Sequence, residues 1–339
     1  MKILICVIWL MTVTGMEGYC RSVSDSLVVV FWNMENFFDH VDQGTGESDK
    51  EFSSYGSRHW SRKKFQTKCD AVAKSIMWMG DRYGRLPDLI GLAEIENRGV
   101  LTKLLSTTVL RKHDYGIVHH DSGDRRGIDV AILYRKSVMR LESESLKTPE
   151  TSGKKLATRD ILHARMCLAD SSKLDFIVNH HPSKYGGEKE SEGRREAAMK
   201  ALKELCDSLD NEHVIAMGDF NDTPDAGSFT IIEGTLVNKG LPLHERGEGT
   251  IRYEGKWDLI DMFMISPSLA GKTRMEVCRI PFLMTWEKKH PGEKPLRTYS
   301  GPRYIGGVSD HCPIVLKMEV RDTRFRRFFS VSRRVFREI

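Results

Sequence analysis

The chain has 339 residues, of which 40% are hydrophobic and 29% are charged, and its formal net charge is +5. These values are close to the globular average and exclude a disordered or collagen-like chain. Beyond the N-terminus, no apolar run approaches the roughly 20 residues of a spanning helix, which excludes a protein with several membrane spans.

The N-terminus has the pattern of an export signal. Lys2 precedes an apolar run over residues 3–13, and small and polar residues follow it. We predict that residues 1–22 are a signal peptide and that the mature chain is exported to the periplasm or the extracellular space. A buried strand or a membrane anchor is the alternative, although the run is short for an anchor. Cys20 suggests a lipoprotein, but Tyr19 stands where a small residue is required, so lipidation is less favoured.

The body of the chain, residues 23–320, alternates short apolar runs with amphipathic segments. Strands are predicted over residues 27–32, 87–92, 128–134, 174–179, 214–218, 259–265 and 313–320, and helices over residues 62–79, 99–107 and 192–209. This pattern predicts an α/β or α+β sheet protein. No composition break or repeat divides the body, so we expect one domain. Two long polar loops, residues 40–60 and 286–307, are expected at the rim of a functional site.

The C-terminal residues 321–339 form a basic amphipathic tail. They hold seven Arg against one Asp and one Glu, which equals the net charge of the whole chain. Such a segment can contact anionic lipid, nucleic acid or an acidic partner surface. The alternative is a terminal helix that packs on the domain and keeps its guanidinium groups in water.

The seven cysteines show no zinc-binding spacing. Removal of the signal peptide would leave five, so at least one thiol has no partner within the chain. The spacings do not reveal which cysteines pair.

Polar strings stand at the ends of the apolar runs, where they could meet at one edge of a sheet. They are Trp32-Asn33-Met34-Glu35-Asn36, Leu92-Ala93-Glu94-Ile95-Glu96-Asn97, Asn179-His180-His181-Pro182-Ser183, Gly218-Asp219-Phe220-Asn221 and Ser309-Asp310-His311. Asp261 lies inside a further apolar strand, where an acid must be paired or bound to a metal. Each string alone could be a helix cap or a turn. Together they suggest an oxygen-ligand site for a hard divalent ion.

In order and approximate spacing, these strings resemble the endonuclease/exonuclease/phosphatase superfamily, which has the deoxyribonuclease-I-like fold. The resemblance extends from about residue 27 to residue 320. It implies an α+β fold, a four-layer αββα sandwich of two packed mixed sheets with the site at one end. It also implies a metal-dependent phosphoester hydrolase that uses Mg²⁺, with Mn²⁺ as the alternative ion.

The resemblance implies a metal site and a catalytic group. Glu94 matches the principal carboxylate ligand of the metal, and the other metal-site residues are Glu35, Asn33 and Asp310. The catalytic residues are His311, Asp261, Asp219, Asn221 and His180. Among these, Asp261 orients His311, and Asn221 and His180 hold phosphate oxygens. Arg159, Arg126 and His181 are further candidates for phosphate contacts, and His181 is the alternative to its neighbour His180.

The general base remains open between two residues. His311 has a suitable pKa and could be oriented by Asp261, as the histidine of a serine protease is oriented by its acid. Alternatively, Asp219 takes the proton from water and His311 stabilises the phosphate. Asn221 and His180 would in either case donate hydrogen bonds to phosphate oxygens.

The substrate is not fixed by the fold, because this superfamily includes nucleases, repair enzymes, sphingomyelin phosphodiesterases and inositol-phosphate phosphatases. Export favours a secreted nuclease that cleaves phosphodiesters by in-line attack of water, with nucleic acid as its substrate. The alternative is an exported phosphatase or a sphingomyelinase-like lipid phosphodiesterase whose Arg/Phe tail contacts a membrane. A third interpretation is an inactive homologue that acts as a binding module. No obligate protein partner is predicted.

Overall fold

The computed structural model describes residues 26–42, 46–184 and 187–319. The predicted signal peptide and the basic tail lie outside these residues. Among the described residues, no helix is both long enough and apolar enough to cross a membrane.

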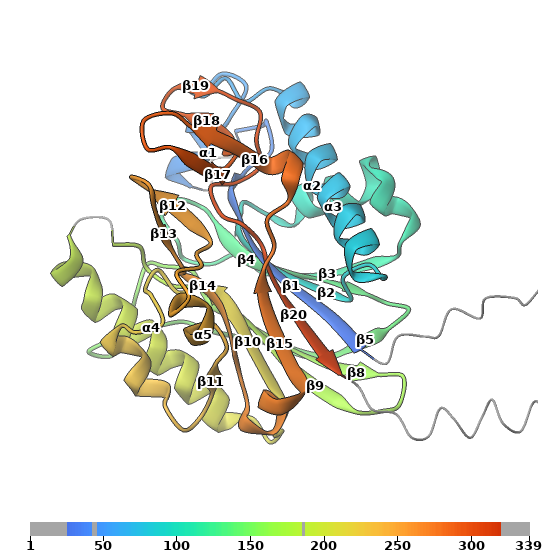
Figure 1. The fold of residues 1–339 in the computed structure, drawn as a ribbon, viewed down its shortest axis with the longest axis vertical. Coiled ribbons are helices and arrows are strands. Elements are labelled where there is room, and N and C mark those ends of the chain that lie inside the picture. Colours follow the sequence, from blue (N-terminus) through green and yellow to red (C-terminus); the bar gives the residue numbers. More distant parts are fainter. Residues whose placement is uncertain (1–25, 43–45, 185–186, 320–339) are drawn as a thin grey trace, which may run out of the picture.

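Two six-stranded mixed sheets form the centre of the molecule (Figure 1). The first has the order β15 (Thr273–Val277), β20 (Ile314–Glu319), β1 (Ser26–Phe37), β2 (Leu89–Ile95), β4 (Asp129–Arg135) and β3 (Tyr115–His119). The second has the order β11 (Val237–Asn238), β14 (Asp261–Ile265), β10 (Val214–Asp219), β9 (Lys173–His180), β8 (Ile161–Leu168) and β5 (Met139–Lys147). Within these sheets, β1 with β2 and β9 with β10 are the parallel pairs.

The sheets pack against each other, and helices cover their outer faces. Alternate residues of β1 show this, since Val28 and Val30 join the core beneath α2 (Arg62–Tyr83) and α3 (Arg98–Thr107). Their neighbour Val29 faces the second sheet. Outside the second sheet lies α4 (Glu188–Ser208). The predicted four-layer α+β sandwich is therefore confirmed.

Most predicted elements are confirmed with shifted bounds. The strand predicted over residues 27–32 extends to Phe37, and the helix predicted over 62–79 extends to Tyr83, where Gly84 closes it in a left-handed conformation at φ 74°. The prediction missed the four edge strands β3, β5, β11 and β15, and also the inner strand β8.

The two long polar segments are more ordered than predicted. The first contains α1 (Glu47–Glu51), and the second contains β17 (Gly292–Pro295), β18 (Tyr299–Ser300) and β19 (Arg303–Tyr304). In the second, β17 pairs with β16 (Met284–Glu287), and β18 pairs with β19. Further short elements are α5 (Leu241–His244) and the paired strands β6 (Glu150–Thr151) with β7 (Lys154–Lys155) and β12 (Ile251–Tyr253) with β13 (Lys256–Asp258). All five described cysteines are free thiols.

A buried ion-pair network joins β8 to β9. The carboxylate of Asp175 accepts hydrogen bonds from Arg165 at 2.9 and 3.1 Å and from Asn211 at 2.8 Å, and it lies 2.7 Å from His163 Nε2. Burial alone would raise the pKa of Asp175, but these hydrogen bonds outweigh it and lower the pKa to about 2. Asp175 therefore stabilises the fold as an anion.

We expect Asp175→Asn to lower the free energy of unfolding by about 3 kcal/mol, because the partly buried Arg165 loses its buried counter-charge. Urea denaturation at neutral pH measures the loss. The difference between wild type and variant should shrink as the pH falls below 4 towards 2, where the wild-type carboxylate also becomes neutral. Asp210→Asn removes an exposed carboxylate from the same Arg165 and is the control, with little expected change. Equal effects of both substitutions would contradict this role.

Candidate active site

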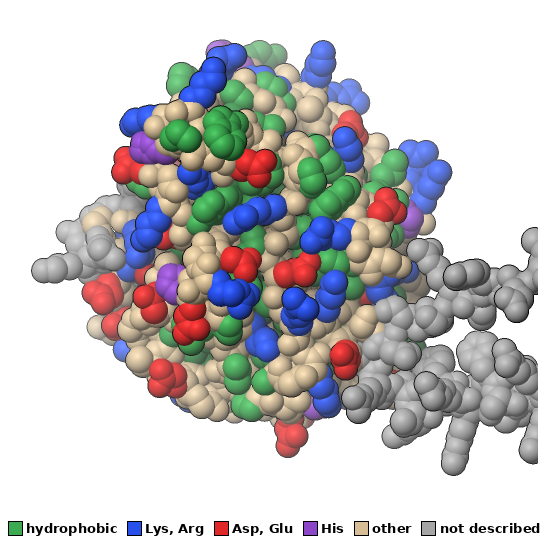
Figure 2. Space-filling model, in the orientation of Figure 1, with side chains coloured by type: hydrophobic (Ala, Val, Ile, Leu, Met, Phe, Trp, Pro, Cys, Tyr) green, Lys and Arg blue, Asp and Glu red, His purple; other side chains and the backbone are tan. Residues whose placement is uncertain are grey.

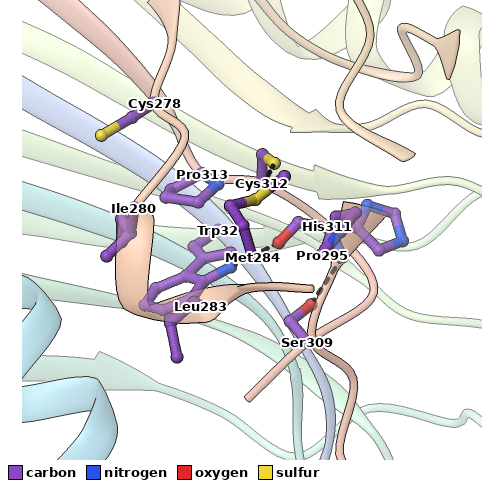
Figure 3. Close-up of a pocket in the computed structure, with 10 residues that line it drawn as sticks. All are labelled: Trp32, Cys278, Ile280, Leu283, Met284, Pro295, Ser309, His311, Cys312 and Pro313. Atoms are coloured by element: carbon purple, nitrogen blue, oxygen red, sulfur yellow. Dashed lines mark hydrogen bonds between the residues drawn. The ribbon is translucent and has the colours of Figure 1, made fainter. Parts of the chain in front are cut away.

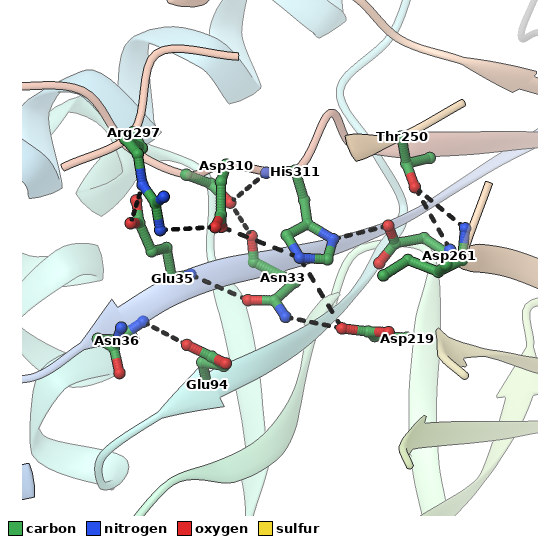
Figure 4. A network of polar contacts seen from close by, with 12 residues as sticks. Asn33, Glu35, Asn36, Glu94, Asp219, Thr250, Asp261, Arg297, Asp310 and His311 are labelled. Atoms are coloured by element: carbon green, nitrogen blue, oxygen red, sulfur yellow. Dashed lines mark hydrogen bonds and ion pairs between the residues drawn. The ribbon is translucent and has the colours of Figure 1, made fainter. Parts of the chain in front are cut away.

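The two sheets bring their polar strand ends together at one edge of the sandwich. Strand β9 ends at His180 and the parallel strand β10 ends at Asp219, so these residues are neighbours in register. The antiparallel strand β14 begins at Asp261, directly opposite Asp219. From the first sheet, Asn33 Nδ2 donates to Asp219 Oδ2 at 3.0 Å. This hydrogen bond joins the two sheets at the site (Figure 4).

His311 forms a close pair with Asp261. Its Nδ1 lies 2.7 Å from Asp261 Oδ2, and its Nε2 lies 3.9 Å from Asp219 Oδ2. Thr250 Oγ1 accepts from the backbone N–H of Asp261 at 3.4 Å. The backbone of the loop is also fixed, since Ser309 Oγ accepts from the His311 N–H at 2.9 Å. Asp261 therefore orients the imidazole so that Nε2 faces Asp219.

An apolar pocket supports the histidine loop from below. Trp32 lines it and donates from Nε1 to the backbone oxygen of His311 at 3.0 Å. Figure 3 shows the imidazole pointing away from the apolar side chains that line this pocket. Core packing thus fixes the backbone of His311, while its imidazole ring lies beside Asp261 and Asp219.

Glu94 is held between backbone and guanidinium donors. The backbone N–H of Asn36 donates to Glu94 Oε2 at 2.7 Å, and Arg126 contacts both carboxylate oxygens at 3.3 and 3.4 Å. Arg126 also donates to Asn36 Oδ1 at 2.6 Å. The predicted metal ligand therefore lies in a fixed orientation with its charge balanced by Arg126.

Glu35 and Asp310 form a second carboxylate pair bridged by Arg297. Arg297 Nε donates to Glu35 Oε1 at 3.0 Å, and its Nη2 donates to Asp310 Oδ2 at 2.8 Å. The backbone N–H of Thr298 donates to Glu35 Oε2 at 2.7 Å. Beneath them, the buried Lys68 donates to the backbone oxygen of Glu35 at 2.7 Å and to Thr298 Oγ1 at 3.0 Å.

The two adjacent histidines take different positions. His180 Nε2 lies 3.7 Å from Asp219 Oδ2, whereas the ring of His181 packs edge-on against Phe220 at 4.9 Å. The backbone oxygen of His181 accepts from Asn221 Nδ2 at 2.9 Å and from Arg159 at 2.7 Å. Of the pair, the geometry therefore favours His180 for a phosphate contact.

Arg159 and Asn221 support the site through the backbone. The guanidinium of Arg159 is buried and also donates to Asp124 at 3.0 Å, which ties it to the loop that carries Arg126. The N–H of Asn221 donates to Asp219 Oδ1 at 2.9 Å. In these contacts both residues position their neighbours.

Burial and mutual repulsion shift the acids and bases of the site. Burial and the charge of Asp261 raise the pKa of Asp219 to about 7, and burial and Asp310 raise that of Glu35 to about 7. Burial lowers the pKa of His311, but Asp261, Asp219 and Asp310 outweigh this and hold it well above its usual value. Near neutral pH, His311 is therefore an imidazolium.

The same burial keeps His180 neutral. Its pKa lies well below the usual value because of desolvation and the nearby charges of Arg159 and Arg126. Its Nδ1 and Asp261 Oδ1 are both buried without a hydrogen-bond partner in the described residues. A buried polar atom without a protein partner is typically hydrogen-bonded to a ligand or to an ordered water.

Residues 28–320 match the family model described as the endonuclease/exonuclease/phosphatase family. The chain belongs to this family. Its superfamily hydrolyses phosphoester bonds, and the resemblance that the polar strings indicated is thereby confirmed. A comparison with curated proteins gives no match.

Solved structures share this fold at low sequence identity. A humanised zebrafish TDP2 is 15% identical, covers 87% of this chain and 99% of its own, and has a TM-score of 0.54. A mannosyl-6-phosphatase of Bacteroides thetaiotaomicron is 16% identical, with coverages of 86% and 98% and a TM-score of 0.54. Zebrafish TDP2 with a single-strand DNA product is 15% identical, with coverages of 86% and 98% and a TM-score of 0.50. At these identities the likeness shows the fold alone.

The donor set of the site fits a hard divalent ion such as the family uses. Glu94 and Asp310 offer carboxylate oxygens, which Mg²⁺ and Mn²⁺ prefer. Asp219, Asp261 and His311 form a further group whose ligand atoms lie within 4.8 Å of one another. Both oxygens of Glu35 and both oxygens of Glu94 already accept hydrogen bonds within the protein, and Asn33 Oδ1 accepts from the Glu35 N–H, so a bound ion would share these oxygens with protein donors.

Several residues of this site were missed in the sequence. Lys68 lies in a helix, Arg297 and Thr298 lie in a polar loop, and Thr250 lies in a turn. Their neighbours in the sequence carry no motif that marks them. The polar loop of residues 286–307, which contains Arg297 and precedes the Ser309-Asp310-His311 string, was the one signal, and it was interpreted as the rim of a site.

We expect Lys68→Met to lower kcat about 10²-fold, because the backbone of Glu35 and the loop at Thr298 lose their common donor and the carboxylates move. The free energy of unfolding should fall by about 2 kcal/mol, since two buried acceptors lose their partner. Hydrolysis of a small phosphodiester and urea denaturation measure the two effects. Lys74→Met is the control, because Lys74 lies on the same helix over the ring of Phe282 at 4.3 Å and touches no site residue. Full activity of Lys68→Met would contradict this positioning role.

Proposed function

We propose that the chain is an exported, divalent-metal-dependent nuclease that hydrolyses phosphodiesters by in-line attack of water. The observation that carries the proposal is the group formed by Asp219, His311 and Asp261, joined across the sheets to Asn33 beside Glu94. Glu94 and Asp310 would hold the ion, and when bound it would neutralise charge that develops on the phosphate and the leaving group.

Asp219 is the better candidate for the general base. Its Oδ1 accepts from the N–H of Asn221 and its Oδ2 accepts from Asn33, so the carboxylate is fixed at the end of β10. Its raised pKa of about 7 suits proton transfer from water near neutral pH. Of the two alternatives that the sequence left open, this is the one the geometry favours.

His311 then acts on the phosphate. As an imidazolium it keeps one N–H on Asp261 and presents the other from Nε2 towards the region beside Asp219. A charged donor in this position stabilises a developing negative oxygen. The neutral His180 adds a further polar group, with its Nε2 3.7 Å from the same Oδ2 of Asp219.

Nucleic acid is the proposed substrate for two reasons. A solved structure of the same fold carries a single-strand DNA product, and Arg126 and Arg297 contact the site carboxylates Glu94 and Glu35. The predicted signal peptide adds the proposal of export, which favours a scavenging nuclease over a repair enzyme.

A phosphomonoester is the second candidate substrate. Arg126 and Arg297 flank the carboxylates, and their side chains are 40% and 46% exposed. Two accessible guanidinium groups suit a phosphate with two negative charges. One of the solved structures of this fold is a mannosyl-6-phosphatase, which supports this alternative.

The proposal is tested by hydrolysis with Mg²⁺ or Mn²⁺ and with EDTA. The substrates are single- and double-stranded DNA, RNA, sugar phosphates, inositol phosphates and sphingomyelin. We expect cleavage of polynucleotide that EDTA abolishes. Glu94→Gln should lower metal affinity, measured by calorimetric titration, together with activity. Turnover of phosphomonoesters alone would replace the nuclease by the second candidate.

The role of His311 predicts a specific pH dependence. We expect His311→Ala to lower kcat at least about 10²-fold. If the imidazolium is the active form, kcat/KM falls as the pH rises through the pKa of His311. Asp261→Asn removes the charge that raises this pKa, so the falling limb should move to lower pH. A shift of the rising limb instead would make His311 the base.

A further inference from the structure

Two segments far apart in the sequence form one cationic surface next to the site. Arg58 Nη1 donates to the backbone oxygen of Gly301 at 2.7 Å, and Tyr299 Oη donates to the backbone oxygen of Arg58 at 2.9 Å. Lys64 Nζ donates to the backbone oxygens of Arg58 and His59 at 3.1 and 2.9 Å. These contacts join the start of α2 to the hairpin of β18 and β19. We name the cations of this surface, Arg58, Arg62, Lys63, Lys64 and Arg303, the cationic ridge.

The cationic ridge has an excess of accessible positive charge. Arg58 pairs with Glu51 at 2.7 Å. Arg62, Lys63 and Arg303 are exposed, and within the described residues no carboxylate lies at ion-pair distance from them. Aromatic rings hold the inner cations in place, since Lys64 Nζ lies 4.9 Å from the ring centre of Tyr304. The structure therefore keeps three cations free for an outside partner.

A short run of chain connects the site to the cationic ridge, because Tyr299 donates to the backbone oxygen of Arg58. Arg297 donates to Glu35 and Asp310, the N–H of Thr298 also donates to Glu35, and Tyr299 is the next residue in the chain. Figure 2 shows Lys and Arg side chains along the upper edge of the molecule, where Figure 1 places α1, β18 and β19. A polyanion whose reacting phosphate lies in the site can therefore continue onto the cationic ridge.

We infer that the cationic ridge binds the phosphate backbone of a nucleic acid strand beside the scissile phosphate. This inference rests on the proposed nuclease function. It adds the direction in which the bound strand extends from the scissile phosphate across the protein surface. Three residues before Arg58, the side chain of Tyr55 is fully exposed and offers a base a stacking face. A membrane-binding surface would instead need exposed apolar side chains, and the exposed Trp286 lies on β16 outside the ridge.

The test uses a full-chain variant, Arg62→Gln/Lys63→Gln/Arg303→Gln, in which the three free cations are replaced by glutamine. Binding of a fluorescent 30-nucleotide single strand is measured in EDTA at several salt concentrations. We expect the slope of log K against log salt to decrease in magnitude by about 2, because each neutralised phosphate on a single strand contributes about 0.7. At low salt the affinity should fall at least about tenfold.

A matched control removes three cations at the opposite end of the first sheet. Lys272→Gln/Arg274→Gln/Lys317→Gln changes the charge equally. These exposed residues lie away from the site, with Arg274 on β15, Lys317 on β20 and Lys272 directly before β15. Its slope should equal that of the wild type. The melting temperature of each variant verifies folding. If the triple ridge variant is unstable, Arg303→Gln alone should still lower the slope by about 0.7.

The outcomes separate this inference from the proposed function. Polynucleotide cleavage by the wild type with an unchanged slope in the ridge variant overturns the ridge and leaves the nuclease. If the ridge variant shows a reduced slope but the wild type hydrolyses only phosphomonoesters, the cationic ridge binds the strand and the proposed nuclease function is wrong. If the ridge variant loses binding to anionic phosphatidylserine vesicles but not to the strand, the ridge is a lipid surface and the inference is wrong.

Discussion

The site depends on the burial of several carboxylates in one cluster. Glu35, Asp219 and Asp261 are nearly inaccessible to water, and burial alone would favour their neutral forms. Hydrogen bonds from backbone and amide N–H groups offset part of this cost, and cations balance the remaining charge. The buried Lys68 and the imidazolium of His311 both supply such charge. The folded state therefore depends on the polar network of the site as well as on its apolar core.

This compensation links the catalytic geometry to the packing of the sheets. The donors to Asp219 come from β1 and from the turn after β10, so the network spans both sheets. The strand order puts β1 at the middle of the first sheet and β10 at the middle of the second. Side chains such as Val29 and Met217 fill the space between them. A change in that packing therefore moves the two halves of the site relative to each other.

The strands that carry the site could be predicted because each combines an apolar run with a polar end. These polar ends marked the site residues on β1, β2 and β10, Asp261 stood inside the apolar run of β14, and the resemblance to the family supplied their roles. The edge strand β5 was missed because most of its side chains are exposed, and its pattern is not apolar. The choice between His180 and His181 depends on register, which alternation alone does not give. It is the pairing of His180 with Asp219 that distinguishes them.

The supporting cations could not be predicted, for a different physical reason. Arg297 acts on Glu35, 262 positions away, and Lys68 acts on Thr298, 230 positions away. Neither contact leaves a local pattern, because the partner is set by how a loop closes over the sheet edge. A buried lysine on an amphipathic helix looks like any surface lysine in the sequence. Only the folded chain shows that its ammonium lies beneath the carboxylates.

Four of the nine residues other than glycine that have positive φ in the described chain lie where these groups meet. Glu35, Asn36, Glu94 and Asn221 all have positive φ, between 46° and 61°, which costs residues other than glycine of order 1–3 kcal/mol each. Glycine would relieve the strain but would remove the carboxylate or amide that the site uses. The hydrogen bonds to Glu94 and from Lys68 hold two of these turns in place. The chain therefore gives up some stability at the strand ends in order to aim these side chains at one point.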